Sequence, residues 1–230
     1  MNEPPEVEEQ DEFELHFKDL KSRMKLIASA DPDQYLSDLS LRRYLNAFGD
    51  ADKAFHAILK TNKWRREYGV KDLTKDHPVM RRYIGENKAI ILDYRDGLGR
   101  PVIYIPAKNY NSSSRNLDEM TKFIVYCLEE ASNMCVEDFT DDICLVFDLS
   151  GFNISSIDYQ LVKNIIWLIS KHYPERLGVC LILNASSMFS GCWTIIKGWL
   201  NKKTTQKVHF IDNEEQLSRY LLPAIIPEEV

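Results

Sequence analysis

Four short, uninterrupted apolar segments, spaced by stretches with helical periodicity, limit most strongly how this chain can fold. Strands that are apolar at nearly every position are typical of a mostly parallel sheet covered on both faces. A turn-rich connection, Arg95–Pro101, joins the first two segments and predicts a hairpin, so one strand should be antiparallel. We therefore expect an α/β fold with a mostly parallel five-stranded sheet, built from residues 88–93 (KAIILD), 102–106 (VIYIP), 143–148 (ICLVFD), 179–184 (VCLILN) and a short last strand at 207–211.

The helical segments divide the chain into parts. Apolar residues recur at steps of three and four from Phe13 to Ile27, and two more helical blocks follow a break at Asp31–Asp33, as amphipathic helices require. Strand signals begin only after Pro78. We predict a loose acidic tail over residues 1–12, a helical N-terminal lobe over 13–78 and an α/β lobe over 79–230, with helices near 117–131, 159–170 and 189–200. The expected N-cap residues are Asp50 and either Ser114 or Asn116.

The composition argues against two classes of function. The chain has 29 Lys and Arg against 35 Asp and Glu, a net charge of −6, whereas dedicated nucleic-acid binders show a basic excess. Only 9 of the 230 residues are glycine, and neither a P-loop nor a dinucleotide-binding glycine fingerprint occurs. We therefore expect neither a nucleic-acid partner nor a glycine-loop nucleotide enzyme.

Metal and membrane-spanning functions are also disfavoured. None of the five histidines lies at metal-ligand spacing from another His or Cys, and the five cysteines, without a CxxC pair, suit reduced thiols in a cytoplasmic protein. The N-terminus has no apolar core typical of a signal peptide. Residues 179–196 form an uncharged run of 18 residues, but Asn184 and Ser190 within it would be costly in lipid. We predict no metal, no cofactor other than a bound ligand, and no membrane span.

Serine catalysis has one weak candidate. No GxSxG nucleophile elbow occurs. Ser186 or Ser187, after the strand ending at Asn184, could act with His209 as base and Asp148 as its orienting carboxylate, because strand ends of α/β sheets carry such groups. Serines after a strand are more often turn or cap residues. We favour the cap interpretation and expect no catalytic residue.

The helix predicted at 189–200 has two clear faces. One carries large apolar groups and the other is polar, and the helix is followed by Lys202 and Lys203. The pattern fits a helix packed against the sheet. It fits equally a mobile amphipathic lid that opens at a membrane surface with its lysines near anionic headgroups. The apolar face comprises Phe189, Trp193, Ile196, Trp199 and Leu200, and the polar face Ser190, Thr194, Lys197 and Asn201.

Several motifs together resemble one known family. The segment 172–178 (HYPERLG), followed by a strand and by the helix ending at Trp199-Leu200, is similar to the signature of the CRAL-TRIO lipid-transfer family. The motifs LRRYL (41–45), KWR (63–65), DGLGRPV (96–102) and FDLSG (147–151) also match, in order and with the family's spacing. The resemblance covers residues 35 to 225.

The resemblance implies a helical lobe beside an α/β lobe whose sheet floors a deep apolar pocket. One lipid would sit in that pocket under a mobile gate helix, Phe189–Leu200, whose apolar face was given above. Removing two acyl chains from a bilayer at about 0.8 kcal/mol per methylene costs tens of kcal/mol in water, so a carrier must supply a closed apolar cavity. The implied partners are a phospholipid, a transient membrane surface and an unknown protein, with a cytoplasmic, peripherally membrane-associated location.

Three residues match the headgroup set of the branch that transfers phosphatidylinositol. By that resemblance Lys207 would face the phosphodiester, Thr204 would donate to a phosphate oxygen and Glu175 would accept from inositol hydroxyls. Taken singly, Glu175 is more simply explained as a surface partner of Arg176, and Lys207 as a solvated strand-end charge. The presence of all three together favours the lipid role.

Two departures from the family pattern widen the range of ligands. Asn46-Ala47-Phe48 stands where the family usually continues with an arginine that helps hold the phosphate, and the C-terminal motif is represented only by Leu222-Pro223. Retinoid- and tocopherol-binding relatives share the fold. The open alternatives are a carrier of another hydrophobic ligand, such as a sterol, tocopherol or retinoid, and a lipid-sensing regulatory scaffold.

Overall fold

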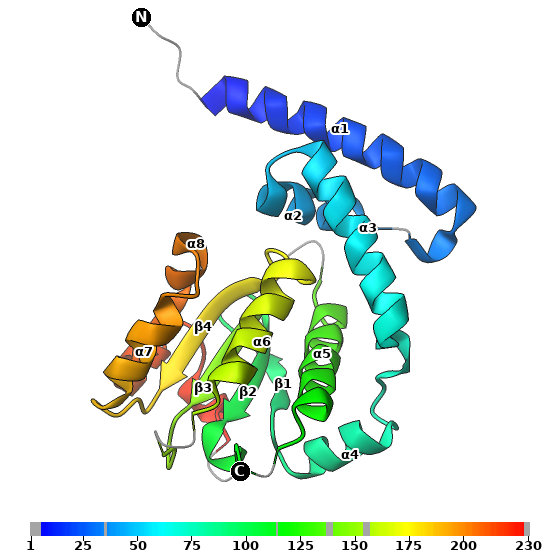
Figure 1. The fold of residues 1–230 in the computed structure, drawn as a ribbon. Helices are drawn as coiled ribbons and strands as arrows, with labels where there is room; N and C mark the ends of the chain where they lie inside the picture. Colours follow the sequence, from blue (N-terminus) through cyan, green and yellow to red (C-terminus); the bar gives the residue numbers. More distant parts are fainter. Residues whose placement is uncertain (1–5, 35, 114, 137–139, 154–156, 228–230) are drawn as a thin grey trace, which may run out of the picture. The chain divides into compact units, whose positions relative to one another are not determined.

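The computed structural model describes residues 6–34, 36–113, 115–136, 140–153 and 157–227 (Figure 1). The chain forms two compact units, which are described separately. The first consists of Met1–Gly69 with Lys171–Glu175, and the second of Val70–Ser170 with Arg176–Val230. The helix α4 (Pro78–Gly85) therefore belongs to the α/β unit.

The first helix begins earlier than the periodicity predicts. The expected loose tail over residues 1–12 is wrong from Glu6 onward, because α1 spans Glu6–Ala30. No glycine or proline interrupts residues 6–12, so the helix can begin before the first apolar residue of the stripe. Residues 1–5, the rest of the predicted tail, lie outside the described residues.

The predicted helical stripes of the N-terminal region meet in one core. After the 3₁₀ turn η1 (Pro32–Gln34), α2 spans Asp38–Phe48 and α3 spans Ala51–Tyr68. Asp50 caps α3 as predicted, its carboxylate accepting from the backbone N–H of Lys53 at 2.8 Å. The buried side chains come from all three helices and include Phe17, Leu20, Met24, Leu41, Leu45, Ala54 and Ile58.

Two sequence motifs meet within this first unit. The Trp64 indole of α3 stacks on the His172 imidazole with ring centroids 3.8 Å apart and planes 12° apart. The Thr61 hydroxyl donates to the Lys171 carbonyl at 3.2 Å and lies at the same distance from His172 Nδ1. Burial, with the positive charges of Arg65 and Lys171, lowers the pKa of His172 to about 4. The KWR and HYPERLG motifs are thus joined by a neutral, stacked histidine.

The second unit is built on a five-stranded sheet in the order β1-β2-β3-β4-β5. Strand β1 is antiparallel to β2, and all later neighbours are parallel, with Cys144 opposite Val102 and Val179 opposite Cys144. The predicted fold class, a mostly parallel five-stranded α/β sheet, is confirmed. The strands are β1 (Ile90–Arg95), β2 (Pro101–Pro106), β3 (Ile143–Asp148), β4 (Leu177–Leu183) and β5 (Val208–Ile211).

The crossover helices gather on one face of this sheet (Figure 1). Each parallel strand is followed in sequence by its spatial neighbour, and right-handed crossovers that all step in one direction place their helices on the same side. These helices are α5 (Leu117–Asn133), α6 (Tyr159–Lys171), α7 (Phe189–Lys197) and α8 (Lys202–Thr205). The remaining elements are the 3₁₀ turns η2 (Val70–Asp72), η3 (Ala107–Asn109) and η5 (Pro223–Ile225) and the short helix α9 (Glu214–Leu217).

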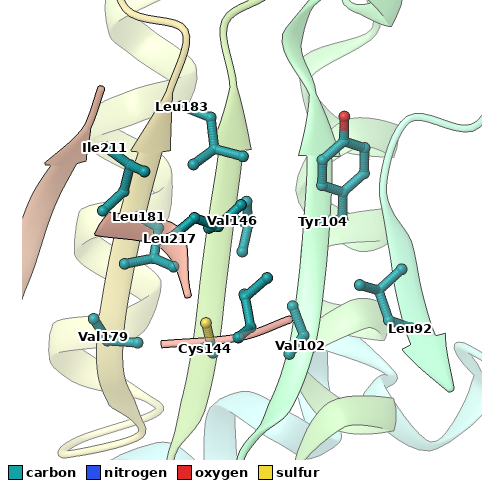
Figure 2. Close-up of a cluster of buried hydrophobic side chains, with 11 residues drawn as sticks. Leu92, Val102, Tyr104, Cys144, Val146, Val179, Leu181, Leu183, Ile211 and Leu217 are labelled. Atoms are coloured by element: carbon teal, nitrogen blue, oxygen red, sulfur yellow. The ribbon is translucent and has the colours of Figure 1, made fainter. Parts of the chain in front are cut away.

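The opposite face is covered by the end of the chain. Alternate residues of the strands pack there in one buried cluster (Figure 2). Leu217 of α9 and Leu221, just after the turn that follows α9, complete the cluster. Strands β2, β3 and β4 are apolar at nearly every position because both of their faces are covered, one by the crossover helices and one by this C-terminal segment. The strand members of the cluster are Leu92, Val102, Tyr104, Cys144, Val146, Val179, Leu181, Leu183 and Ile211.

The predicted helix 189–200 is shorter in the structure. Helix α7 ends at Lys197 with Gly198 as its C-cap, so Trp199 and Leu200 lie in the turn that follows. Glycine is a poor helix former and is common where helices end, which explains the stop. Asn201 then caps α8, accepting from the Thr204 N–H at 2.7 Å.

The DGLGRPV and HYPERLG motifs meet at the N-terminal edge of the parallel strands. Asp96 and Arg100 are both buried, and their side chains form an ion pair at 2.6 Å. Gly178, at the start of β4, lies directly against this arginine: a Cβ at Gly178 would be 2.7 Å from Arg100 Cδ and 2.6 Å from Asp142 Oδ2. The glycine of the second motif is therefore required by the close approach of the first.

Candidate functional site: an apolar cavity under the crossover helices

The α/β unit encloses a cavity of about 280 Å³ between the sheet and the helices on its covered face. The floor comes from alternate residues of the parallel strands, as the period of two in a strand requires. These residues point away from the cluster shown in Figure 2, which occupies the other face. The floor residues are Ile103, Ile105, Leu145, Phe147, Cys180, Ile182 and Val208.

Two helices form the walls. On α5 the lining residues include Met120, Ile124, Cys127 and Leu128. On α6 the lining residues are Leu161, Val162, Ile165, Ile166 and Ile169. A space lined this way offers water few hydrogen-bond partners, so it suits a hydrocarbon ligand.

Helix α7 and the turn after it close one side of the cavity. Four of the five predicted gate residues line it, namely Phe189, Trp193, Ile196 and Leu200. The fifth, Trp199, lies instead against Tyr159 of α6, with ring centroids 5.7 Å apart. The side chains predicted for the polar face of α7, including Ser190, Thr194 and Lys197, are exposed.

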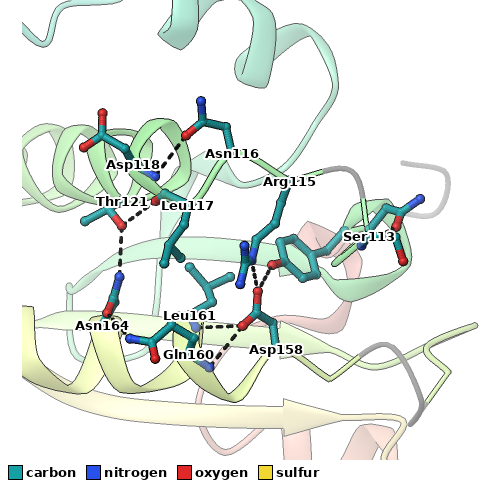
Figure 3. A network of polar contacts seen from close by, with 12 residues as sticks. Ser113, Arg115, Asn116, Leu117, Asp118, Thr121, Asp158, Gln160, Leu161 and Asn164 are labelled. Atoms are coloured by element: carbon teal, nitrogen blue, oxygen red, sulfur yellow. Dashed lines mark hydrogen bonds and ion pairs between the residues drawn. The ribbon is translucent and has the colours of Figure 1, made fainter.

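A polar cluster stands at the end of the cavity near the start of α6 (Figure 3). Asp158 lines the cavity and caps α6, accepting from the N–H groups of Gln160 and Leu161 at 3.0 Å each. Its other oxygen accepts from the Tyr110 hydroxyl at 2.6 Å and from Arg115. Burial by itself raises the pKa of Asp158, but the hydrogen bonds from Arg115 and Tyr110 outweigh it and hold the pKa well below its usual range.

The sequence prediction missed this cluster. Its available signal was an aspartate directly before the apolar periodicity of 159–170, which is typical of an N-cap. A matching prediction succeeded on α5, where Asn116 accepts from the N–H groups of Asp118 and Glu119 at 3.1 and 3.2 Å. Ser114, the alternative cap, lies outside the described residues.

The three predicted headgroup residues fall in different places. Thr204 of α8 lines the cavity. Lys207 itself does not line the cavity; its Nζ donates to the backbone carbonyl of Leu177, a lining residue, at 2.6 Å. Glu175 belongs to the first unit, half-buried and with φ of 56°. Its joint role with the other two stays a prediction.

The residues considered for serine catalysis have other partners. Asp148 accepts from the Tyr104 hydroxyl at 2.5 Å and from Asn184 Nδ2 at 2.9 Å. His209 pairs with Leu181 across β5 and β4 and lies beside the Tyr220 ring, 5.3 Å between centroids, on the face opposite the cavity. The carboxylate and imidazole of the hypothetical triad therefore take part in sheet packing.

Among the residues that the structure describes, neither a metal-binding cluster nor a membrane-spanning helix is found. Within that part of the chain, no group of three or more His, Cys, Asp or Glu side chains is placed to hold a metal ion. Among the helices that the structure describes, none combines the length and apolar character needed to cross a bilayer.

Fold and cavity together define a class of protein: an α/β domain that encloses an apolar space between a mostly parallel sheet and its crossover helices. The model of the CRAL/TRIO domain family matches residues 85–230. The chain therefore belongs to the CRAL/TRIO family, and the resemblance drawn from its motifs is confirmed.

Three curated relatives illustrate the range of similar proteins. CRAL-TRIO domain-containing protein C3H8.02 of Schizosaccharomyces pombe is 31% identical over 86% of this chain and 45% of its own length. Phosphatidylinositol transfer protein CSR1 of Eremothecium gossypii is 27% identical over 85% of this chain and 47% of its own length. Sec14 cytosolic factor of Schizosaccharomyces pombe is 27% identical over 82% of this chain and 73% of its own length. The chain thus spans less than half the length of the first two.

The fold is also found in a solved structure. The crystal structure of Sfh5 aligns with a TM-score of 0.76, covering 96% of this chain and 85% of Sfh5, at 16% sequence identity. At that identity the similarity supports the fold only.

Proposed function

We propose that the protein binds one lipid molecule in the cavity of the α/β unit and transfers it between membranes or presents it to a protein partner. The observation that carries this proposal is the cavity lining, which is apolar on the floor, on both helical walls and on α7. Hydrocarbon in water is unfavourable by about 0.8 kcal/mol per methylene, so a lipid leaves a bilayer readily only for an equally apolar site. Exchange of one lipid for another then nearly balances the free energy.

Phosphatidylinositol is the ligand that the proposal favours. Thr204 at the cavity wall and Lys207, which bonds to the backbone of the lining residue Leu177, would hold the phosphodiester, because charge-assisted hydrogen bonds to phosphate are among the strong ones. Glu175 would accept from inositol hydroxyls. The name of the relative from Eremothecium gossypii, a phosphatidylinositol transfer protein, supports this choice.

The outer surface of α7 supports a transient membrane contact. Met188, the N-cap of α7, and Ile195 within it are 73% and 48% exposed, and lysines 197, 202 and 203 are exposed as well. Exposed apolar groups next to lysines favour weak binding to an anionic bilayer, while the net charge of −6 disfavours a tight electrostatic hold. We therefore expect a cytoplasmic protein that associates peripherally with membranes, as the name Sec14 cytosolic factor suggests for one relative.

Native mass spectrometry of the purified protein, followed by lipid extraction, tests the ligand directly. Bound phosphatidylinositol supports the proposal. A sterol, tocopherol or retinoid would identify a carrier of another hydrophobic ligand. A protein that stays empty after incubation with liposomes would instead be a regulatory scaffold, and the transfer function would be wrong.

The headgroup assignment is tested by Lys207→Gln, which removes the positive charge and keeps an N–H donor. A lost charge-assisted hydrogen bond is worth about 1.5–3 kcal/mol, so phosphatidylinositol loading should fall about ten- to hundredfold. The arginine that usually shares the phosphate is replaced at Phe48, which favours the upper end. Lys202→Gln, an equal change of charge at an exposed position, is the control.

Transfer of labelled phosphatidylinositol between liposomes is measured for each variant beside labelled phosphatidylcholine. Selective loss of phosphatidylinositol transfer in the Lys207 variant supports the assignment. An equal loss of both lipids would mean that the bond to Leu177 supports the fold and not the headgroup. No loss of either would overturn the assignment of Lys207 to the phosphate.

A further inference from the structure

The cavity of the α/β unit extends between two edges of the sheet. Helix α6 follows β3 and precedes the parallel strand β4, so it runs back from the carboxyl ends of the strands to their amino ends. Figure 1 shows the start of α6 and helix α8 at opposite ends of this unit. Among the lining residues, Asp158 at the start of α6 therefore lies at one end and Thr204 of α8 at the other.

A network of polar side chains stands at the Asp158 end (Figure 3). Tyr110 and Arg115, which precede α5, both donate to one carboxylate oxygen of Asp158, and two backbone N–H groups of α6 donate to the other. Further along both helices, Asn164 Nδ2 donates to the Thr121 hydroxyl at 3.3 Å. The starts of α5 and α6, the two walls of the cavity, are thus tied together by hydrogen bonds.

The polar groups at this end already have hydrogen-bond partners. Each oxygen of Asp158 accepts two hydrogen bonds, and the Asp158 side chain is 6% exposed. Lys88, which precedes the antiparallel strand β1 and lines the same end, donates to the Asn109 carbonyl and lies 3.3 Å from a Glu86 oxygen. A hydrocarbon chain offers no hydrogen bonds, so it cannot displace these groups without breaking the Asp158–Arg115 pair and leaving a buried charge unpaired.

We propose that Tyr110 and Asp158 form a stop that limits the length of hydrocarbon chain that the cavity accepts, and that Arg115 is a positioning residue that holds Asp158 in place. The proposal rests on the proposed function, which puts the headgroup near Thr204 and so directs the chain ends toward Asp158. It makes these residues the determinants of acyl-chain length, whereas the apolar floor and walls bind hydrocarbon without regard to its length.

The exchange of a lipid between bilayer and cavity sets the expected size of the effect. A methylene that moves from one apolar environment to another keeps its free energy nearly unchanged, so loading from vesicles should not depend on chain length while the chain fits. Each methylene beyond the stop loses its apolar surroundings, and loading should then fall about fourfold per methylene. The chain length at which this fall begins therefore measures the position of the stop.

Two substitutions move the stop in opposite directions. Tyr110→Ala removes a half-buried ring from the end of the cavity, and a limit two methylenes longer would raise loading of the longest chains about fifteenfold. Ala107→Leu enlarges a lining residue that follows β2 at the same end, so the fall should begin at shorter chains. The matched control is Tyr94→Ala, the loss of an equal ring at a position of β1 that is 62% exposed. Thermal unfolding shows whether each variant keeps the fold.

Arg115 is tested through the same length profile, because a merely structural role would change loading equally at every chain length. Arg115→Gln removes the charge that holds Asp158, so the fall should begin at longer chains. Arg115→Lys keeps a cation beside Asp158 and should restore the wild-type profile. A wild-type profile in Arg115→Gln would overturn the role of Arg115.

The profile is measured by incubating each protein with vesicles that contain saturated phosphatidylinositols of increasing chain length in equal amounts, followed by mass spectrometry of the bound lipids. Tyr110→Ala should extend the profile, Ala107→Leu should shorten it, and Tyr94→Ala should match the wild type. Unchanged profiles in both cavity variants, or an equal loss at every chain length, would overturn the stop.

A parallel series of free fatty acids separates this proposal from the proposed function. If phosphatidylinositol is not loaded while the fatty-acid profile still shifts in Tyr110→Ala, the stop stands and the assignment of phosphatidylinositol fails. If phosphatidylinositol is loaded and neither series shifts, the proposed function stands and the stop is wrong. A protein that loads neither series overturns both.

Discussion

Replacing Gly178 with alanine should destabilise the α/β unit strongly, although alanine is the smallest possible addition. The new methyl would lie 2.6 Å from Asp142 Oδ2 and 2.7 Å from Arg100 Cδ. Neither neighbour can easily move: Arg100 is 8% exposed and paired with buried Asp96, and Asp142 accepts from the Thr140 hydroxyl. Overpacking costs about 1–3 kcal/mol, and breaking a buried ion pair costs about 3–5 kcal/mol. We expect a loss of about 2–4 kcal/mol.

The matched control is Gly191→Ala. A Cβ at Gly191 meets nothing within 4 Å, and the residue lies inside α7, so alanine there should stabilise the protein by up to about 1 kcal/mol. Urea unfolding followed by circular dichroism measures both variants. Thermal melting should drop by about 5–15 °C for Gly178→Ala, given about 2–4 °C per kcal/mol in chains of this size. If the two variants differ by less than about 0.5 kcal/mol, the close approach at Gly178 is not real.

Two further predictions concern the histidine and the gate. Because the pKa of His172 is lowered to about 4 in the folded state, the unfolded state takes up a proton first as the pH falls below about 6.5, and stability should decline between pH 6.5 and 4. Urea unfolding of wild type and His172→Gln should show that the wild type loses about 1 kcal/mol more stability by pH 5, after allowance for the partial exposure of the ring. Equal losses in the two proteins would contradict this prediction. Trp193→Ala removes a cavity-lining ring whose centroid also lies 5.4 Å from that of Phe210. Lipid transfer should therefore slow severalfold with little change in melting temperature. If the variant simply unfolds, α7 is a structural cover and not a gate.

Local sequence patterns predicted the elements well, because strands, helices and caps depend on neighbouring residues. The apolar segment predicted as a strand at 179–184 is β4, displaced by one or two residues. Asp50 and Asn116 were correct as caps because such a bond reaches only three residues along the chain. The errors in helix boundaries arose where the spacing of apolar residues does not decide where a helix begins or ends. These places are the acidic start of α1 and Gly198 at the end of α7.

The resemblance to the family supplied what periodicity could not, namely that the strands and helices enclose a ligand cavity. The apolar face of α5 was visible in the sequence, but an apolar face predicts burial and not what is buried against it. Met120 and Ile124 line a cavity, whereas equally apolar Val102 and Val146 pack under the C-terminal segment. Sheet order and the direction of the crossovers decide between these outcomes.

The tertiary structure alone decided the partners of the charged groups. Lys207 is a strand-end lysine in the sequence, and only the parallel pairing of β4 and β5 brings its ammonium within 2.6 Å of the Leu177 carbonyl, 30 residues away. Asp158 meets Arg115 and Tyr110 across more than 40 residues, and Trp199, in the turn after α7, meets Lys163 of α6. The sequence by itself predicted the strands to within two residues, the longer helices and the family. It could not determine these contacts, because they depend on how separate elements pack and not on the period within any one of them.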